Sequence, residues 1–410
     1  EPLPKILLNY LDLLKQLKDF KRYVINSKNN YFIMDNYINS SIKLDLHSKI
    51  NLLGLSKSDI SRHLYNLGVE KKELSMRVQQ LFSWTHSHGK KSFDYMTNLS
   101  KEFRDLLSKE FSISRPQIIN KQISIDGTRK YLFKSENFGE FETVFIPEDE
   151  RGTICISSQI GCTLNCSFCH TGTQKLVRNL EPHEIVGQIS AVKDDLSDWC
   201  GKKNSTLKRA VSNVVVMGMG EPLYNFENVK QGLKIIMDNE GLSISRKKIT
   251  LSTSGVVPYI HKVSSEIGCL LAISLHGTTD EIRNELVPIN RKWNIQELIA
   301  TLKSYPNLSN TERITFEYVM LRKVNDSLDD AKRLVKLIKN IPSKINLIPF
   351  NPWPGSNYKT SEPETVKIFA NYIKKAGYSS PVRKPRGVDI MAACGQLKSY
   401  SVREKVLKKV

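Results

Sequence analysis

The chain of 410 residues lacks long apolar segments and paired cysteines, and acidic residues are scarce relative to basic ones. No apolar run approaches the roughly 18 residues that a membrane-spanning helix needs, and no signal peptide is recognisable at the start. Seven cysteines are an odd number, which argues against a framework of structural disulfides. Disordered and low-complexity classes are also excluded, because 40% of the residues are hydrophobic. We therefore expect a soluble, cytoplasmic protein.

The formal net charge of +19 is unevenly distributed. Residues 1–110 contain 18 lysines and arginines against 12 acidic residues, and residues 370–410 contain ten against two. A field of this sign attracts polyanions, and nucleic acid is the leading candidate. The alternative is a solvated basic surface that only aids solubility.

The N-terminal half of the chain divides into three segments. Residues 1–50 form an N-terminal extension of uncertain order, and Met34 is a candidate natural start. Residues 51–112 show apolar residues at helical spacing and predict a small helical accessory domain. Residues 113–150 change to an alternating period, which predicts a β-hairpin linker that carries Glu142.

Strand and helix patterns alternate over residues 151–380, and a basic C-terminal segment carrying Cys394 covers residues 381–410. Such alternation predicts a parallel sheet with right-handed crossovers. Six units are fewer than a full eight-fold barrel contains. We therefore expect an α/β fold, a partial (β/α)6 barrel with its site at the C-terminal ends of the strands. The predicted strands are Thr153–Ser157, Asn213–Met217, Lys248–Thr253, Leu270–Leu275, Arg313–Leu321 and Lys344–Pro349.

Three cysteines lie close together just after the first of these strands. Cys162, Cys166 and Cys169 are spaced by four and three residues, so their thiolates can converge on one soft metal centre. A four-iron cluster with three cysteine ligands leaves one iron open to bind a substrate or cofactor. The alternative is a zinc site completed by His170 or Cys155.

A glycine-rich turn, Gly218–Leu223, directly follows the second predicted strand. Glycines allow the backbone to approach a ligand closely, and Glu221 is suited to hold an ammonium group. An ordinary tight turn explains the glycines equally well, so the motif gains weight only together with the cysteine loop.

The two motifs together resemble the radical S-adenosylmethionine superfamily, and further segments narrow the resemblance. In sequence order they are similar to the RlmN-type RNA methyltransferases, which methylate carbon 2 of an adenosine in 23S ribosomal RNA and in certain transfer RNAs. The resemblance covers about residues 50–400. The segments are Glu142–Pro147, Cys155–Cys162, Leu251–Gly255, Ile273–His276, Ile348–Pro352 and Asp389–Gln396.

The resemblance implies two cofactors and assigns residues to each. Cys162, Cys166 and Cys169 would bind a 4Fe-4S cluster. S-adenosylmethionine, two molecules per turnover, would occupy a pocket at the strand ends. The residues implied for that pocket are Gly220, Glu221, Ser252, Ser274, Leu275, His276 and Asn351. Without the family, ordinary hydrogen bonding at strand ends explains the serines and the histidine as well.

The resemblance also implies three catalytic residues. Cys394 would accept a methyl group from the cofactor. Carbon 2 of adenine is electron-poor and cannot attack the sulfonium methyl group itself, whereas a thiolate can. After a radical derived from the methyl group adds to the base, Cys155 would release the product by forming a disulfide with Cys394. Glu142, or alternatively Cys155, would remove the proton from carbon 2. Cys200 and Cys269 match no motif and are interpreted as structural.

The expected partners are 23S ribosomal RNA, transfer RNA and an electron donor such as flavodoxin or ferredoxin, with a monomer as the default state. Two alternatives remain: a methyltransferase specific for carbon 8 of the same adenosine, and a non-catalytic zinc module that binds RNA. The basic residues best placed for RNA are Lys374, Lys375, Arg383, Lys384 and Arg386, with Lys71, Lys72, Arg77, Lys90 and Lys91 in the helical domain.

Overall fold

The computed structural model describes residues 49–199 and 209–401. The candidate start Met34, nearly all of the predicted N-terminal extension and Cys200 lie outside the described residues. The described residues from Asn51 onwards form one compact unit. None of the helices in this part of the chain is both long and apolar enough to cross a bilayer.

The unit is organised around one mixed sheet, which has nine strands among the described residues. Six strands pair in parallel in the order β13-β12-β11-β10-β9-β6. These six match the predicted strands, and the predicted partial barrel is confirmed. They are β6 (Gly152–Cys155), β9 (Asn213–Val216), β10 (Ile249–Thr253), β11 (Leu270–Ser274), β12 (Ile314–Met320) and β13 (Ser343–Pro349).

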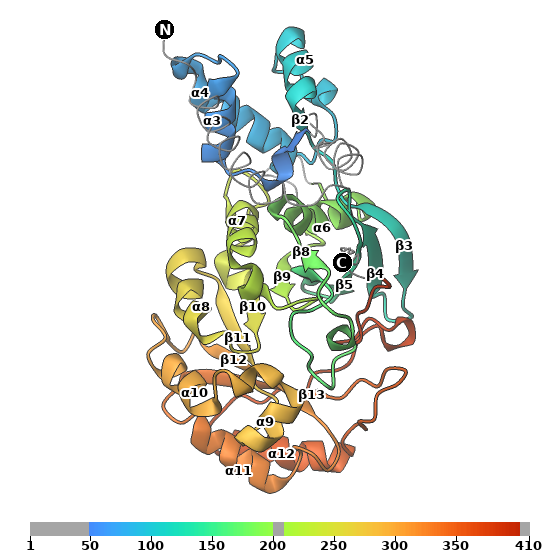
Figure 1. Ribbon diagram of the computed structural model, residues 1–410, viewed down its shortest axis with the longest axis vertical. Helices are drawn as coiled ribbons and strands as arrows, with labels where there is room; N and C mark the ends of the chain where they lie inside the picture. The colour runs from blue at the N-terminus through green and yellow to red at the C-terminus, as the bar shows by residue number, and fades with distance from the viewer. Residues whose placement is uncertain (1–48, 200–208, 402–410) are drawn as a thin grey trace, which may run out of the picture. The chain divides into compact units, whose positions relative to one another are not determined.

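Helices connect successive parallel strands and cover the outside of the sheet. Figure 1 shows α7, α8, α10 and α11 following one another along the outer side of the strands. Local sequence sets where they begin: Ser327 caps α11 in a capping box with Asp330, and Asn294 caps α10 in another. The helices are α6 (Pro182–Asp195), α7 (Phe226–Met237), α8 (Val257–Lys262), α9 (Asp280–Leu286), α10 (Ile295–Lys303), α11 (Leu328–Leu337) and α12 (Pro363–Lys375).

The predicted hairpin is present as β4 (Arg129–Lys134) and β5 (Glu140–Pro147), but it is not a separate linker. β5 pairs antiparallel with β6, so the hairpin continues the barrel sheet. A third strand, β3 (Gln117–Ile123), pairs with β4 at the edge and was not predicted. The pairing of Val144 with Cys155 places β5 directly beside the first barrel strand.

In the described residues that precede the sheet, three helices occupy the segment predicted to be helical. They are α3 (Lys57–Asn66), α4 (Lys71–Phe82) and α5 (Lys101–Glu110), with the short strands β1 (Ile50–Asn51) and β2 (Phe111–Ser112) at either end. Ser56 caps α3 and Ser100 caps α5, as serines commonly do. These helices are attached to the barrel through α7, where Gln231 donates a hydrogen bond of 2.6 Å to the Gly54 carbonyl.

Candidate active site

The C-terminal ends of the parallel strands surround a cavity of about 160 Å³, called here the central cavity. Residues from five strands or the loops that follow them line it, which is where a barrel presents its site. The structure therefore brings most of the predicted site residues together. Those on the wall are Cys162, Cys166, Cys169, Gly220, Glu221, Ser252, Ser274, His276 and Cys394.

The three predicted cluster cysteines lie in a loop between the short antiparallel strands β7 (Gln159–Ile160) and β8 (Arg178–Asn179). The loop is tightly folded: the Cys169 amide donates to the Cys166 carbonyl at 3.1 Å. A Cβ atom on Gly172 would lie 2.5 Å from the same carbonyl oxygen. Any side chain at this position would force the loop backbone to move, so Gly172 helps to position the three cysteine thiols.

Burial and mutual repulsion oppose ionisation of these thiols. Burial and then the neighbouring Cys169 raise the pKa of Cys162 to about 12. Burial raises the pKa of Cys166 as well, with further contributions from Cys169 and Cys162. Three thiolates can coexist here only if a cationic centre compensates their charge, which is what a thiolate-ligated metal cluster does.

The thiols are not arranged around a point. Among residues 49–199 and 209–401, no three His, Cys, Asp or Glu side chains converge as ligands of a single metal ion. His170 is also unsuited to complete a zinc site, because its ring stacks on Trp353 with centroids 4.7 Å apart. Its Nδ1 lies 3.2 Å from the Gln396 carbonyl oxygen. Three cysteine thiols without a histidine are the donor set of an iron–sulfur cluster with one open iron.

The glycine turn after β9 places a buried carboxylate opposite the cysteine loop. Gly220 has a φ of +98°, and a Cβ atom there would lie 2.5 Å from Gln159 Cβ, so the turn requires glycine. Glu221 accepts hydrogen bonds from the amides of Ser254, at 2.8 Å, and Leu223, at 3.1 Å. Burial nevertheless raises the pKa of Glu221 to about 6. A cationic ligand group in the cavity would favour its ionised form.

The ends of β10 and β11 contribute hydroxyl groups and a neutral imidazole. Ser252 Oγ lies 3.3 Å from Ser274 Oγ. His276 adopts a left-handed φ of +58°, and its Nδ1 accepts a hydrogen bond of 3.0 Å from the Val319 amide. Burial, together with the charge of Arg283, lowers the pKa of His276 to about 3, so the ring is neutral at physiological pH.

Two residues predicted for the cofactor pocket do not lie on the wall of the central cavity. Leu275 is fully buried, and its amide donates to the Glu317 carbonyl at 3.1 Å. Asn351 donates a hydrogen bond of 3.1 Å from Nδ2 to the Cys394 carbonyl. Asn351 therefore holds the loop of Cys394 in this structure.

Cys394 lies on a loop that contacts the cysteine loop directly. The His170 amide donates to the Gly395 carbonyl at 2.7 Å, which joins the two loops. The Cys394 side chain is open to the cavity but is surrounded by protein, and the resulting desolvation raises the pKa of its thiol. The charge of Glu317 also raises that pKa, whereas the charge of Arg383 lowers it. The thiol thus depends on its neighbours to reach the nucleophilic thiolate form.

Glu317 and Arg383 both line the central cavity, and the sequence did not assign either to it. Glu317 lies within β12, whose seven residues are all buried. An acidic residue within an otherwise apolar, buried strand indicates a functional side chain, and this signal in the sequence was not used. Arg383 was predicted to contact RNA as part of a basic segment, but it also faces the cavity.

Cys155 lies on β6 with its thiol within electrostatic range of Cys394. Burial raises its pKa, and the charge of Cys394 raises it further. Both residues are free thiols. A thiolate at Cys394 therefore makes ionisation of Cys155 less favourable, although Cys155 does not line the central cavity.

Glu142, on the adjacent strand β5, faces a second cavity of about 360 Å³. Its Oε1 lies 3.1 Å from Lys130 Nζ, and its Oε2 accepts a hydrogen bond of 2.9 Å from the Lys398 amide. Burial raises the pKa of Glu142, and the charge of Lys130 opposes this effect. Met391 and Lys398 line the second cavity, so the segment that carries Cys394 contributes to both cavities.

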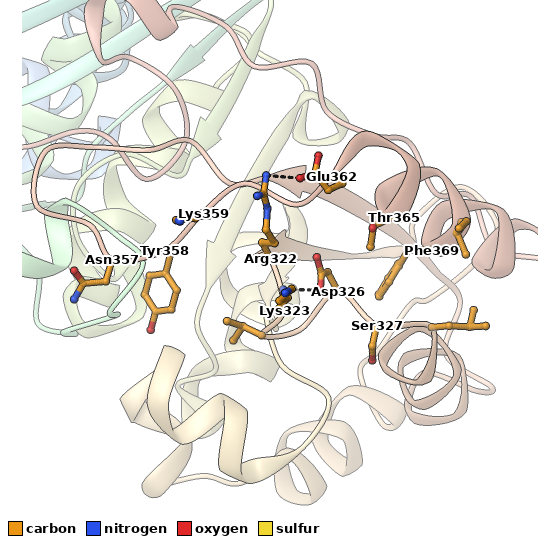
Figure 2. Close-up of a pocket in the computed structure, with 13 residues that line it drawn as sticks. Arg322, Lys323, Asp326, Ser327, Asn357, Tyr358, Lys359, Glu362, Thr365 and Phe369 are labelled. Atoms are coloured by element: carbon orange, nitrogen blue, oxygen red, sulfur yellow. Dashed lines mark hydrogen bonds and ion pairs between the residues drawn. The ribbon is translucent and has the colours of Figure 1, made fainter.

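A third cavity, about 840 Å³, is separate from these and opens beside β12 and α12. Figure 2 shows Arg322 and Glu362 paired on its wall, at 2.7 Å. The Lys323 amide donates to Asp326 at 2.9 Å. The pairing of Arg322 with Glu362 leaves this wall without the cluster of thiols and buried carboxylates that the central cavity has. Tyr358 connects the two regions through a hydrogen bond of 2.8 Å between its hydroxyl and that of Ser167 in the cysteine loop.

Comparison with known proteins identifies the family. The Radical SAM superfamily model matches residues 156–338, and the model of the ribosomal RNA large subunit methyltransferase N-terminal domain matches residues 50–113. The curated dual-specificity RNA methyltransferase RlmN of Paracoccus denitrificans is 58% identical over 356 residues, which cover 86% of this chain and 90% of the relative. The RlmN of Cereibacter sphaeroides is 57% identical over 366 residues, covering 88% and 93%.

A solved structure agrees with this result. The crystal structure of a radical SAM methyltransferase from Sphaerobacter thermophilus superposes with a TM-score of 0.77 at 35% identity, covering 85% of this chain and 99% of that one. The cavity with its thiol triad and the similarity over most of the chain point to the same conclusion. The chain belongs to the RlmN family of radical SAM RNA methyltransferases, enzymes that use a 4Fe-4S cluster and S-adenosylmethionine.

Proposed function

We propose that this enzyme methylates carbon 2 of adenosine in 23S ribosomal RNA and in certain transfer RNAs, by way of a methyl group carried on Cys394. One observation carries the proposal: the thiol of Cys394 shares the central cavity with the three clustered cysteines and Glu221. A nucleophilic thiol there has access to a cofactor bound between these groups. The relatives are named dual-specificity RNA methyltransferases, which supports two classes of RNA substrate.

Cys162, Cys166 and Cys169 would hold the cluster in this proposal, which when bound would supply the electron for reductive cleavage of S-adenosylmethionine to a radical. Glu221 binds the ammonium group of the cofactor, because its buried carboxylate is most stable beside a cation. The paired hydroxyls of Ser252 and Ser274 orient the cofactor from the neighbouring strands β10 and β11.

Cys394 accepts the methyl group because adenine carbon 2 is electron-poor and cannot attack a sulfonium methyl group itself. The thiolate sulfur forms the new bond to carbon while the sulfonium sulfur leaves with the bonding electron pair. Arg383 favours the thiolate through its positive charge. Asn351 and His170 hold the loop so that the sulfur remains in the cavity.

Release of the product requires Glu142 and Cys155. Glu142 takes the proton from carbon 2, since Lys130 at 3.1 Å favours its carboxylate form, whereas burial keeps Cys155 protonated until a later step. The sulfur of Cys155, deprotonated at that step, then bonds to the sulfur of Cys394. The unpaired electron left by radical addition would already have passed back to the bound cluster. The bond from Cys394 to the methylene carbon then breaks, and its electron pair together with a proton completes the methyl group.

The RNA must present an extruded adenine, which costs a few kcal/mol. Phosphate contacts compensate this cost, and Lys374, Lys375 and Lys384 are exposed and suited to provide them. In the helical region, Lys71 and Lys72 are also exposed. The ion pairs of Arg77 with Glu73 and of Lys91 with Asp194 would first have to open.

We place the enzyme in the cytoplasm as a monomer that receives electrons from a flavodoxin or ferredoxin. The competing reaction is methylation of carbon 8, which would use the same cluster and cysteines. Mass spectrometry of nucleosides from 23S ribosomal RNA and transfer RNA treated with the reconstituted enzyme distinguishes the two. We expect 2-methyladenosine in both RNAs, and 8-methyladenosine as the product would refute the proposal.

A further inference from the structure

Glu317 is a buried carboxylate that no step above uses. Its side chain lies on the wall of the central cavity, and the residue is 5% exposed. The register of the sheet pairs it with Ser274 of β11 on one side and Asn346 of β13 on the other. The three polar side chains therefore form a row across neighbouring strands, and Ser252 extends this row through its contact with Ser274.

In the described part of the chain no side chain forms an ion pair with Glu317, although the charges of Arg383 and Lys344 act on it from farther away. Asn346 Nδ2 donates to Oε1 at 2.8 Å, and within the described ranges neither oxygen has a cation at ion-pair distance. The buried glutamates outside the central cavity differ, because Glu142 pairs with Lys130 and Glu184 with Arg178. Burying a carboxylate without such compensation is costly unless a ligand donates hydrogen bonds to it.

The carboxylate does not serve the nearby thiol. A negative charge on Glu317 raises the pKa of Cys394 and thus opposes formation of the thiolate. Glu317 lies on β12, three strands from β9, whose terminal turn carries Glu221. If Glu221 binds the methionine end of S-adenosylmethionine, the nucleoside end of the cofactor would lie on the side of the cavity where Glu317 is.

We propose that Glu317 accepts hydrogen bonds from the ribose hydroxyls of an adenosine bound in the central cavity. A carboxylate is only an acceptor, and the ribose hydroxyls are good donors; nucleotide-binding sites use acidic residues in this way. Two sources offer this chemistry: S-adenosylmethionine and the target nucleotide of the RNA. The inference deepens the proposed function, because both molecules belong to the same reaction.

The test is a binding measurement on protein with its cluster reconstituted, and it needs no turnover. S-adenosylmethionine and its 2′-deoxy analogue are titrated against the wild-type enzyme and Glu317→Ala. We expect the wild type to bind the deoxy analogue at least tenfold more weakly, and Glu317→Ala to bind both compounds alike. If Glu317 had only a structural role, its replacement would weaken binding of both compounds equally and leave the ratio of their dissociation constants unchanged.

A second arm repeats the cycle with RNA that carries either adenosine or 2′-deoxyadenosine at the target position. Loss of discrimination in this arm alone assigns the contact to the RNA, and retained discrimination in both arms overturns the inference. Glu317→Gln preserves the side-chain volume if the alanine variant folds poorly. Glu362→Ala, which removes an exposed carboxylate from the cavity beside β12 and α12, is the matched control and should discriminate like the wild type. An enzyme that methylates carbon 8 would refute the proposed function but leave the cofactor arm unaffected.

Discussion

Gly172 provides a demanding test of the cysteine loop, because the proposed defect is local. In Gly172→Ala the new Cβ atom would lie 2.5 Å from the carbonyl oxygen and 3.0 Å from the amide nitrogen of Cys166. Real Cβ atoms essentially never approach closer than 3.0 Å, so the two backbone segments must separate by at least about 0.5 Å. Metal sites tolerate deviations of about 0.2 Å in ligand distances. The substitution should therefore displace Cys166 from its cluster position.

The expected result is a fall in bound iron of at least severalfold after anaerobic reconstitution, accompanied by loss of the brown colour and of RNA methylation. The fold should persist, since the barrel retains its core. Gly241→Ala is a matched control: its Cβ atom would lie 2.9 Å from the Phe82 ring, remote from the cavity. This variant should lower the melting temperature without losing iron. A Gly172→Ala enzyme with wild-type iron content and activity would show that the loop does not position the cluster.

Substitutions at three further residues separate the roles of the site residues. Cys394→Ala should keep its iron but accept no labelled methyl group and form no product; label on another residue with intact activity would contradict the assignment. Arg383→Ala should shift the rate of methyl loading to higher pH, because loss of the cation raises the pKa of Cys394, whereas Arg383→Lys should keep most of the profile. Glu142→Gln should load methyl normally, as judged by mass spectrometry of the protein, but form product at least tenfold more slowly; unchanged turnover would exclude Glu142 as the base.

The strands of the barrel were predictable because each is a compact apolar or β-branched run followed by a helical pattern. β3 was not, since most of its residues are exposed and it lies at the edge of the sheet. Its strand conformation depends on pairing with β4, which no local pattern reveals.

The site was predictable where motifs lie at strand ends, as for the cysteine loop and Glu221. Glu317 was not predicted from the sequence, because its place in the site depends on the strand register that aligns it with Ser274 and Asn346. Arg383 was interpreted from charge alone, and charge cannot distinguish a phosphate contact from a cavity wall. Leu275 and Asn351 were carried over from the family, and here they lie behind the wall.

The central claim is that Cys394 becomes covalently attached to the RNA and that Cys155 releases it. Incubating Cys155→Ala with S-adenosylmethionine, a reductant and substrate RNA tests this on one denaturing gel. We predict a nuclease-sensitive protein–RNA adduct. Methyl loading and addition to the base proceed in this variant, but the thiol of residue 155 that would attack the sulfur of Cys394 is missing. Cys155→Ala/Cys394→Ala should form no adduct. Normal turnover by Cys155→Ala without trapped RNA would contradict the account and leave Cys155 as a half-buried strand residue whose loss costs roughly 1 kcal/mol of stability.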